Sequence, residues 1–273
     1  MIKEIVFCDI DGTLKNSKGI VTDRNKQAIN KLKKINVEFV LCSGRARGFV
    51  EEVANEVNAG NYIISSNGAD VYDRKKNVEI FKHTIEPKIA LKVLNYFNKL
   101  HTRILIKCGA KNYINTPFDV ETPSPVISSA DFKKVALEGI VQINVMCDDK
   151  QTILKAIKKT NKFKQLEIPN KSKSLFDSSI KHGINEEYYI DVNAINSSKG
   201  EGIQKLVEHL NIPLEKTISI GDSGNDKSMF DKSAIDVAMG NSIPTLKEIA
   251  DVVTNTNNNS GVAEFLEKHY NLK

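Results

Sequence analysis

Glycine and proline are scarce in this chain, at 15 and 7 of 273 residues. Those numbers exclude a collagen-like protein, and 40% hydrophobic with 27% charged residues excludes a disordered one. No apolar run reaches the roughly 18 residues that a membrane-spanning helix needs. The first eleven residues contain a short apolar run and lack the cleavage site of a secretory signal. We therefore expect a folded cytoplasmic protein without a membrane partner, built as one large domain or two smaller ones.

Cysteine is also rare, with four residues and no Cys-x-x-Cys spacing. A structural zinc site or a disulfide framework would need closely spaced pairs. Cys8, Cys42, Cys108 and Cys147 each stand in an apolar run that is typical of a strand. We expect all four to be small buried side chains.

The net charge of +5 comes from the middle of the chain. Residues 84–189 hold 17 Lys or Arg against 11 Asp or Glu, whereas the two flanks together hold 22 against 23. The lysines are scattered and few aromatic residues interleave with them, unlike the dense basic stripe of a nucleic-acid surface. We expect no nucleic-acid partner, and a lysine-rich surface that mildly attracts small anions.

The two flanks alternate short apolar runs with amphipathic helical patterns. In the first flank, strands are expected at Glu4–Cys8, Val37–Cys42 and Tyr62–Ser65, with helices from Thr22 or Asp23 and over Gly48–Val57. The second flank continues with a helix over Lys199–Leu210, strands at Thr217–Ile220 and Ile235–Ala238, and helices at Asn225–Asp231, Ile243–Ala250 and Gly261–His269. This alternation predicts an α/β fold, a Rossmann-like parallel sheet covered by helices.

The middle of the chain has a different character. Helical segments at Pro87–Leu100 and Asp149–Thr160 separate strands at Arg103–Cys108, Ile140–Cys147 and Phe163–Ile168. This pattern indicates an α+β domain inserted into the first. The predicted domains are therefore 1–83 joined with 190–273, and 84–189.

An acidic pair follows the first strand, in the run Val6-Phe7-Cys8-Asp9-Ile10-Asp11-Gly12-Thr13-Leu14. The strand delivers Asp9 and Asp11 to its carboxyl end, where open α/β sheets bind ligands. Gly12 then permits a sharp turn. Two carboxylates this close repel unless a cation or a shared proton separates them. Mg²⁺ suits this position because it takes hard oxygen ligands beside a substrate phosphate.

Three further motifs carry polar side chains. Ser43, Gly44 and Arg45 end the second strand, where a hydroxyl and backbone N–H groups can donate to a phosphate oxygen. Lys199 begins a helix, from which it can place a point charge beside a phosphate. The run Gly221-Asp222-Ser223-Gly224-Asn225-Asp226 brings more acids from another strand, and these can complete a metal site with the first pair.

The order of these motifs resembles that of the haloacid dehalogenase superfamily of phosphotransferases. The runs DIDGTL, SGR, SSNGA, SKG, GDSGND, VAMGN and SGVAEFL are similar to those of its Cof-type branch, subfamily IIB, which contains small-molecule phosphatases. The resemblance covers about Ile2–Lys82 and Ile190–Leu266. It implies an α+β cap domain of the C2B type, inserted between the second and third motifs, where the composition changes.

The resemblance also implies roles for individual residues. Asp9 would be the nucleophile that forms an aspartyl-phosphate, and Asp11 the general acid and then base, with its carbonyl on Mg²⁺. Ser43 and the Gly44 N–H would hold the phosphoryl oxygens, and Lys199 would neutralise their charge. Asp222 would complete the metal site with support from Asp226, and Asn225 would hydrogen-bond to the phosphate or near Ser43. Asn67 is expected to face the same cleft.

The motifs leave other functions and the substrate open. A signalling receiver is a single domain of about 120 residues without an insertion, so length argues against it. A phosphomutase of the same superfamily has the same motifs, and a non-enzymatic binding protein is the third alternative. We expect a small phosphorylated metabolite as substrate, selected within residues 84–189; candidate contacts there are Lys171, Lys173, Lys181 and His182, with Arg45 and Asn67 as further candidates. The oligomeric state is not readable from the sequence.

Overall fold

The computed structural model describes residues 2–120, 122–171 and 188–272, and these fall into two compact units. The first unit joins Met1–Phe81 with Ser198–Lys273, and the second is Lys82–Ser197. The expected second boundary, at Tyr189 and Ile190, is wrong by eight residues. It falls inside the strand β10 (Tyr188–Ala194), whose hydrogen bonds to β8 and β9 tie it to the second unit.

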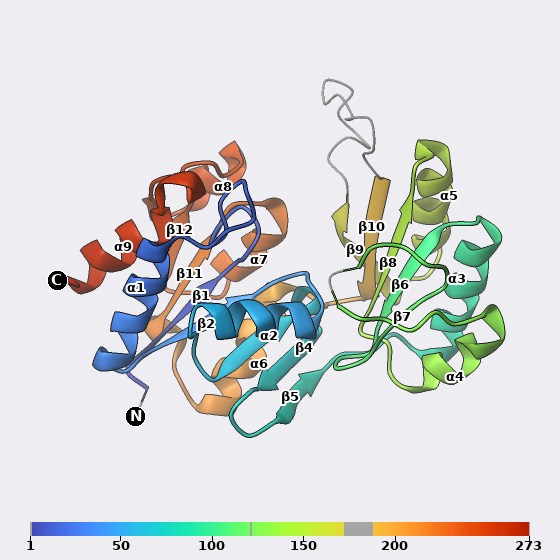
Figure 1. Cartoon of the computed structure of the whole chain (residues 1–273), viewed down its shortest axis with the longest axis horizontal. Coiled ribbons are helices and arrows are strands. Elements are labelled where there is room, and N and C mark those ends of the chain that lie inside the picture. Colours follow the sequence, from blue (N-terminus) through green and yellow to red (C-terminus); the bar gives the residue numbers. More distant parts are fainter. Residues whose placement is uncertain (1, 121, 172–187, 273) are drawn as a thin grey trace. The chain divides into compact units, whose positions relative to one another are not determined.

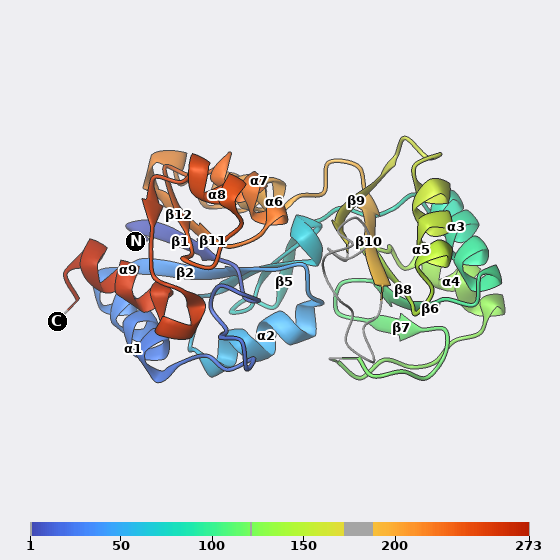
Figure 2. The same cartoon turned by 90° about the horizontal axis from the view of Figure 1, so that it is seen from above.

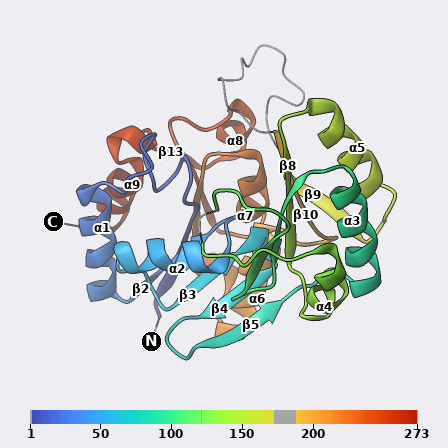
Figure 3. The same cartoon turned by 45° about the vertical axis from the view of Figure 1, so that its right-hand side comes forward.

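The first unit is a three-layer sandwich around an eight-stranded sheet (Figure 2). The strand order is β13 (Val252–Val253), β12 (Ile235–Ala238), β11 (Thr217–Gly221), β1 (Glu4–Cys8), β2 (Val37–Cys42), β3 (Tyr62–Ser65), β4 (Asp70–Asp73) and β5 (Val78–Lys82). Strands β13 to β3 pair in parallel, as predicted, but β4 turns back antiparallel to β3. Figure 3 shows β2 to β5 side by side at this end of the sheet.

Helices cover both faces of this sheet. On one face lie α1 (Asp23–Leu32), α2 (Arg47–Glu56) and α9 (Gly261–Tyr270), which share a buried cluster with Val6, Cys8 and Leu41. On the other lie α6 (Lys199–Leu210), α7 (Lys227–Phe230) and α8 (Pro244–Ile249), packed on Ile5, Phe7 and Val40. Successive side chains of β1 therefore point to opposite apolar layers, which explains its continuous apolar run.

The second unit is a five-stranded sheet with helices on one face (Figure 1). Its strand order is β7 (Asn112–Ile114), β6 (Arg103–Lys107), β8 (Gln142–Cys147), β10 and β9 (Leu166–Lys171), and its helices are α3 (Pro87–Lys99), α4 (Phe132–Leu137) and α5 (Lys150–Thr160). Neighbouring strands in this order, from β7 to β9, pair antiparallel, so the expected α+β character is observed. Strand β9 lies three residues later than expected, because 163–165 form the turn after α5.

Two smaller expectations concern cysteines and membrane association. All four cysteines are free thiols; three are buried as expected, but Cys147 is only partly buried, because it ends β8 beside the α5 N-terminus. Across 2–120, 122–171 and 188–272, no helix combines the length and the apolar character needed to cross a bilayer.

Candidate active site

The carboxyl ends of three neighbouring strands meet at one edge of the core sheet. In the parallel register of β1, Cys8 lies opposite both Leu41 of β2 and Ile220 of β11. The residues that follow these strands therefore emerge side by side. The structure thus brings together the first, second and fourth sequence motifs, which carry Asp9, Ser43 and Asp222.

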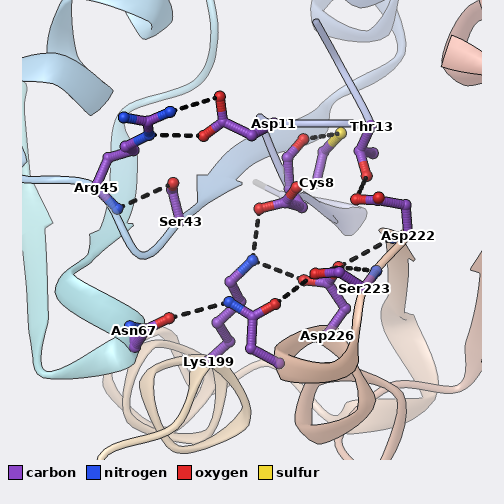
Figure 4. A network of polar contacts seen from close by, with 12 residues as sticks. Cys8, Asp11, Thr13, Ser43, Arg45, Asn67, Lys199, Asp222, Ser223 and Asp226 are labelled. Atoms are coloured by element: carbon purple, nitrogen blue, oxygen red, sulfur yellow. Dashed lines mark hydrogen bonds and ion pairs between the residues drawn. The ribbon is translucent and has the colours of Figure 1, made fainter. Parts of the chain in front are cut away.

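A buried ammonium group links two of the acids. Lys199 is the first residue of α6, and its Nζ donates to Asp9 Oδ1 at 2.5 Å and to Asp226 Oδ1 at 2.6 Å (Figure 4). The exposed fractions of Lys199, Asp9 and Asp226 are 1%, 5% and 0%. Because water is almost excluded, these ion pairs fix the three side chains firmly, and loss of Lys199 would leave two buried carboxylates uncompensated.

The pKa values of Asp9 and Lys199 are both raised, but for different reasons. Burial raises the pKa of Asp9 well above its ordinary value; Lys199 opposes this effect, and the carboxylates of Asp226 and Asp222 add to it. Burial alone would lower the pKa of Lys199, but Asp226 and Asp9 outweigh it, so that pKa is raised. The ammonium therefore stays charged, whereas the negative charge on Asp9 calls for a further cation nearby.

Three carboxylates form a group that can hold such a cation. Asp9, Asp222 and Asp226 each place an oxygen within 4.8 Å of the others, and their three negative charges face the single ammonium of Lys199. Carboxylate oxygens are the hard ligands that Mg²⁺ prefers, so this donor set fits a divalent hard cation in both charge and chemistry.

Asp226 is already engaged through both of its oxygens. Oδ1 accepts from Lys199, and Oδ2 accepts the backbone N–H groups of Asp222 and Ser223, each at 2.9 Å. The bond from Ser223 is one half of the capping box of a short 3₁₀ turn, and both bonds shape the loop that carries Asp222. Asp226 therefore suits a supporting position, whereas Asp9 and Asp222 suit direct contact with a metal.

The Asp11 carboxylate lies apart from this acidic group. It accepts two hydrogen bonds from the Arg45 guanidinium, Nε to Oδ2 at 2.8 Å and Nη2 to Oδ1 at 3.1 Å. Both side chains are partly exposed, at 46% for Asp11 and 42% for Arg45. The sequence did not predict this ion pair. It leaves the backbone carbonyl of Asp11, and not its carboxylate, as the group suited to the metal role.

Ser43, Asn67 and Asn225 lie next to one another on the other side of the site. The Ser43 hydroxyl accepts the Arg45 N–H at 3.2 Å, so its own proton remains available for an acceptor. The Asn67 N–H donates to Ser43 O at 3.1 Å, and Asn225 Nδ2 donates to Asn67 Oδ1 at 3.1 Å. A Cβ on Gly44 would lie 2.9 Å from Asn67 Oδ1, so a larger residue there would displace the Asn67 amide.

The turn that carries Asn67 has an uncommon backbone. Ser66, Asn67 and Gly68 have φ values of 52°, 56° and 90°, three successive left-handed residues. Such strain persists only where the surroundings enforce it. The Ser66 N–H donates to Arg45 O at 2.9 Å, and a Cβ on Gly68 would lie 1.8 Å from Ser198 O. The turn is therefore wedged between the second motif and the start of α6.

A buried ion pair braces the same turn from behind. Arg47 donates to Asp70 through Nε at 2.8 Å and Nη2 at 2.5 Å, and the Asp70 side chain is 0% exposed. The Ser65 hydroxyl donates to Asp70 Oδ2 at 2.7 Å. Because Arg47 begins α2 directly after the second motif, the pair fixes that motif relative to the strained turn.

Asparagines from the carboxyl-terminal part of the chain hold the loop that follows Asp11. Asn241 Nδ2 donates to Gly12 O at 2.8 Å, and Asn257 Nδ2 donates to Lys15 O at 2.9 Å. The Asn257 N–H donates in turn to Asn241 Oδ1 at 2.9 Å. The loop is thus fastened through its main-chain carbonyls.

Residues 6–266 match the sequence profile of the haloacid dehalogenase-like hydrolases. The chain belongs to this family. Phosphatase YwpJ of Bacillus subtilis is 28% identical over 97% of this chain and 99% of its own length. The B. subtilis 5-amino-6-(5-phospho-D-ribitylamino)uracil phosphatase YcsE is 27% identical over 98% and 96%. These relatives confirm the interpretation of the chain as a phosphatase of this family.

A solved structure supports the same fold assignment. The subclass IIB sugar phosphatase BT4131 of the haloacid dehalogenase superfamily superposes with a TM-score of 0.78, covering 99% of this chain and all of its own. At 21% identity this likeness concerns the fold, a parallel-sheet core with a cap domain of the IIB type. It confirms the fold class expected from the motifs.

Thr13 also belongs to this site, although it was not predicted: its hydroxyl donates to Asp222 Oδ1 at 3.0 Å. A hydroxyl residue two positions after Asp11, in the same loop, was the available signal. Of the four candidates expected in the middle of the chain, Lys171 is an exposed residue at the end of β9. Lys173, Lys181 and His182 lie outside the described residues.

Proposed function

We propose that this protein is a Mg²⁺-dependent phosphatase that hydrolyses phosphate monoesters of small metabolites through an aspartyl-phosphate on Asp9. The observation that supports it most is the Asp9 carboxylate, held by Lys199 beside the oxygens of Asp222 and Asp226. The names of two proteins similar to this chain, one a ribitylaminouracil phosphatase and one a sugar phosphatase, indicate small phosphorylated substrates. The cytoplasmic location stays a prediction from composition.

Asp9 and Asp11 share the two chemical steps. In the first, an Asp9 carboxylate oxygen attacks phosphorus, the bond to the leaving oxygen breaks, and that oxygen takes a proton from Asp11. In the second, Asp11 removes a proton from water, the water oxygen attacks phosphorus, and the bond to Asp9 breaks to release inorganic phosphate. Both Asp11 oxygens accept hydrogen bonds from Arg45, so one of them must leave that pair to carry the proton that the first step needs.

The remaining residues bind and neutralise the phosphoryl group. The Ser43 hydroxyl and the neighbouring backbone donate to its oxygens, Asn225 fixes Asn67 beside them, and the Lys199 ammonium offsets their charge. Asp9, Asp222 and the Asp11 carbonyl would hold Mg²⁺, with Asp226 shaping their loop. When bound, the ion supplies positive charge against which an anionic nucleophile can approach an anionic substrate.

The test is release of inorganic phosphate from a panel of phosphorylated metabolites with Mg²⁺ present. Wild-type protein should release phosphate and, after an acid quench, carry one phosphoryl group by mass. Asp9→Asn and Asp11→Asn should be almost inactive, whereas Asp231→Asn, the same change at an exposed site of the same unit, should behave as wild type. Conversion of hexose 1- and 6-phosphates without phosphate release would identify a phosphomutase instead. A chain that never carries the phosphoryl group would contradict the proposal.

A further inference from the structure

A lysine stands beside the general acid without a role in the chemistry described so far. Lys15 follows Asp11 by four residues, and the two form a parallel β-bridge. The Lys15 N–H donates to Ile10 O at 2.9 Å, and its carbonyl accepts from Asn257 at 2.9 Å. Its main chain is therefore fixed next to that of Asp11.

Two cations share one aromatic ring at this place. The Lys15 ammonium lies 4.5 Å from the centroid of the Phe49 ring, and the Arg45 guanidinium carbon lies 5.2 Å from the same centroid. Phe49 belongs to α2 and packs against the core cluster of the first unit, so the ring has a fixed support. The face of an aromatic ring attracts cations, and here it gathers two of like charge.

The charges of these two cations are not balanced to the same degree. Arg45 is paired with Asp11. In the described ranges 2–120, 122–171 and 188–272, no carboxylate lies within 4.0 Å of the Lys15 ammonium. The positive charge of Lys15 therefore has no carboxylate partner within ion-pair distance among these residues, and a further anion would be attracted to it.

We infer that Lys15 and Arg45, gathered on Phe49, form an anion subsite that favours phosphate monoesters whose leaving group carries a second negative charge. The inference rests on the proposed role of Asp11, because the group that protonates the leaving oxygen faces the leaving group. Lys199, in contrast, is buried between Asp9 and Asp226, where it would address the phosphoryl group. The second anion can be a carboxylate or another phosphate.

Arg45 and Lys15 would have different parts in this subsite. An anion that approaches Arg45 also competes with Asp11 for it, and so would free the acid that the first step needs. Lys15 carries no such obligation, because its ammonium lies over the Phe49 ring and has no carboxylate partner among the described residues. Substitution of Lys15 should therefore change the choice of substrate and leave the chemical steps intact.

The turnover experiment compares substrates matched in size. 3-Phosphoglycerate is paired with glycerol 3-phosphate, and fructose 1,6-bisphosphate with fructose 6-phosphate, so that one pair tests a carboxylate and the other a phosphate. Wild-type kcat/KM should favour the anionic member of at least one pair. Lys15→Gln should reduce that preference by about 5-fold or more, Lys15→Arg should retain it, and added salt should weaken it.

The matched control is Lys18→Gln, which removes the same charge from an exposed position of the same loop. It should change the preference by less than about 2-fold, as expected for a solvent-screened charge. If Lys15→Gln and Lys18→Gln lost the preference for the anionic substrate equally, the net charge of the protein would explain the effect, and the inference would be overturned. Equal loss on charged and uncharged substrates in Lys15→Gln would assign Lys15 to positioning of Asp11 and overturn it as well.

A binding measurement separates this inference from the proposed function. Calorimetry with 3-phosphonopropionate and propylphosphonate, which differ by a carboxylate, needs no turnover. Tighter binding of the former, lost in Lys15→Gln and kept in Lys15→Arg, would support the subsite even in a chain without phosphatase activity. Equal binding of both compounds to the wild-type protein would overturn the subsite, whether or not the protein is a phosphatase.

Discussion

Two ion pairs on either side of the site differ in their access to water. The side chains of Lys199, Asp9 and Asp226 are 1%, 7% and 0% exposed, whereas those of Arg45 and Asp11 are 42% and 46% exposed. A buried ion pair is rigid and its loss can cost several kcal/mol, whereas an exposed ion pair exchanges its partners readily. The difference fits the proposed roles, because the nucleophile needs a fixed position, whereas the acid must release and regain a proton within one cycle.

The largest effect on activity should come from the buried ion pair, through Asp9→Asn. An amide cannot attack phosphorus, so phosphate release should fall by about 10⁴-fold or more. The metal-free protein should not lose stability, because the Asp9 charge is buried beside the carboxylates of Asp226 and Asp222, and Lys199 keeps Asp226 as a partner in the variant. Phosphate assays and urea unfolding of wild type and variant, both in chelator, measure the two effects. A clearly less stable Asp9→Asn protein would show that the Lys199 contact outweighs burial.

Metal removal should stop turnover almost as completely. Asp9 and Asp222 present oxygens that need a cation between them, and Lys199 alone does not balance three acids. Phosphate release should vanish in excess chelator and return with Mg²⁺. Ca²⁺ should inhibit, because its longer bonds and higher ligand number would misplace Asp9. Full activity in chelator would rule out the proposed metal role.

The comparison of the two pairs can be tested directly on stability. Lys199→Met leaves two buried carboxylates without their partner and should destabilise the metal-free fold by about 3–5 kcal/mol. Arg45→Gln breaks an exposed pair and should cost less than about 1 kcal/mol. Urea unfolding of both variants without metal gives the two numbers. Losses of similar size would show that exposure does not separate these pairs.

The smallest effect concerns an acid outside the site. Asp236 accepts hydrogen bonds from the hydroxyls of Ser219 at 3.0 Å and Ser233 at 2.6 Å, and burial raises its pKa from 3.8 to about 6. The folded state thus holds this proton more tightly than the unfolded state, so its contribution to stability falls as pH rises from about 4 to 6. Asp236→Asn keeps the acceptor oxygen and should flatten that fall by less than about 1 kcal/mol. Unfolding curves across this pH range would show an unchanged slope if the carboxylate stays ionised.

The sequence predicted the residues at strand ends well, for a physical reason. An apolar run fixes where a strand ends, and parallel strands end at one edge, so Asp9, Ser43 and Asp222 had to be neighbours. Contacts among side chains far apart in sequence have no such rule. The pairs Arg45–Asp11 and Arg47–Asp70 depend on side-chain directions in loops and at a helix start, which periodicity does not encode.

The fold was predicted less well where strands are partly polar. Strand β4, Asp70–Asp73, begins and ends with an aspartate, so its composition resembles that of a turn. It is nevertheless buried, because Asp70 accepts hydrogen bonds from Arg47 and Ser65. Strand β10 carries Asp191 and Asn193 buried on one face, which hid its continuation beyond Tyr189 and displaced the domain boundary. In both strands polar groups satisfy one another inside the structure, a pattern that simple hydrophobicity does not reveal.

The asparagine contacts to Gly12 and Lys15 have a consequence for synthesis of the chain. The second unit, Lys82–Ser197, is continuous in sequence, so all its internal contacts are available once Ser197 has left the ribosome. The loop that follows Asp11 is made before the second unit, whereas Asn241 and Asn257, which hold it in place, are made after that unit. A nascent chain therefore carries Asp9 without a completed site until Asn241 and Asn257 have been made, and phosphatase activity begins only when these residues have folded back onto the loop.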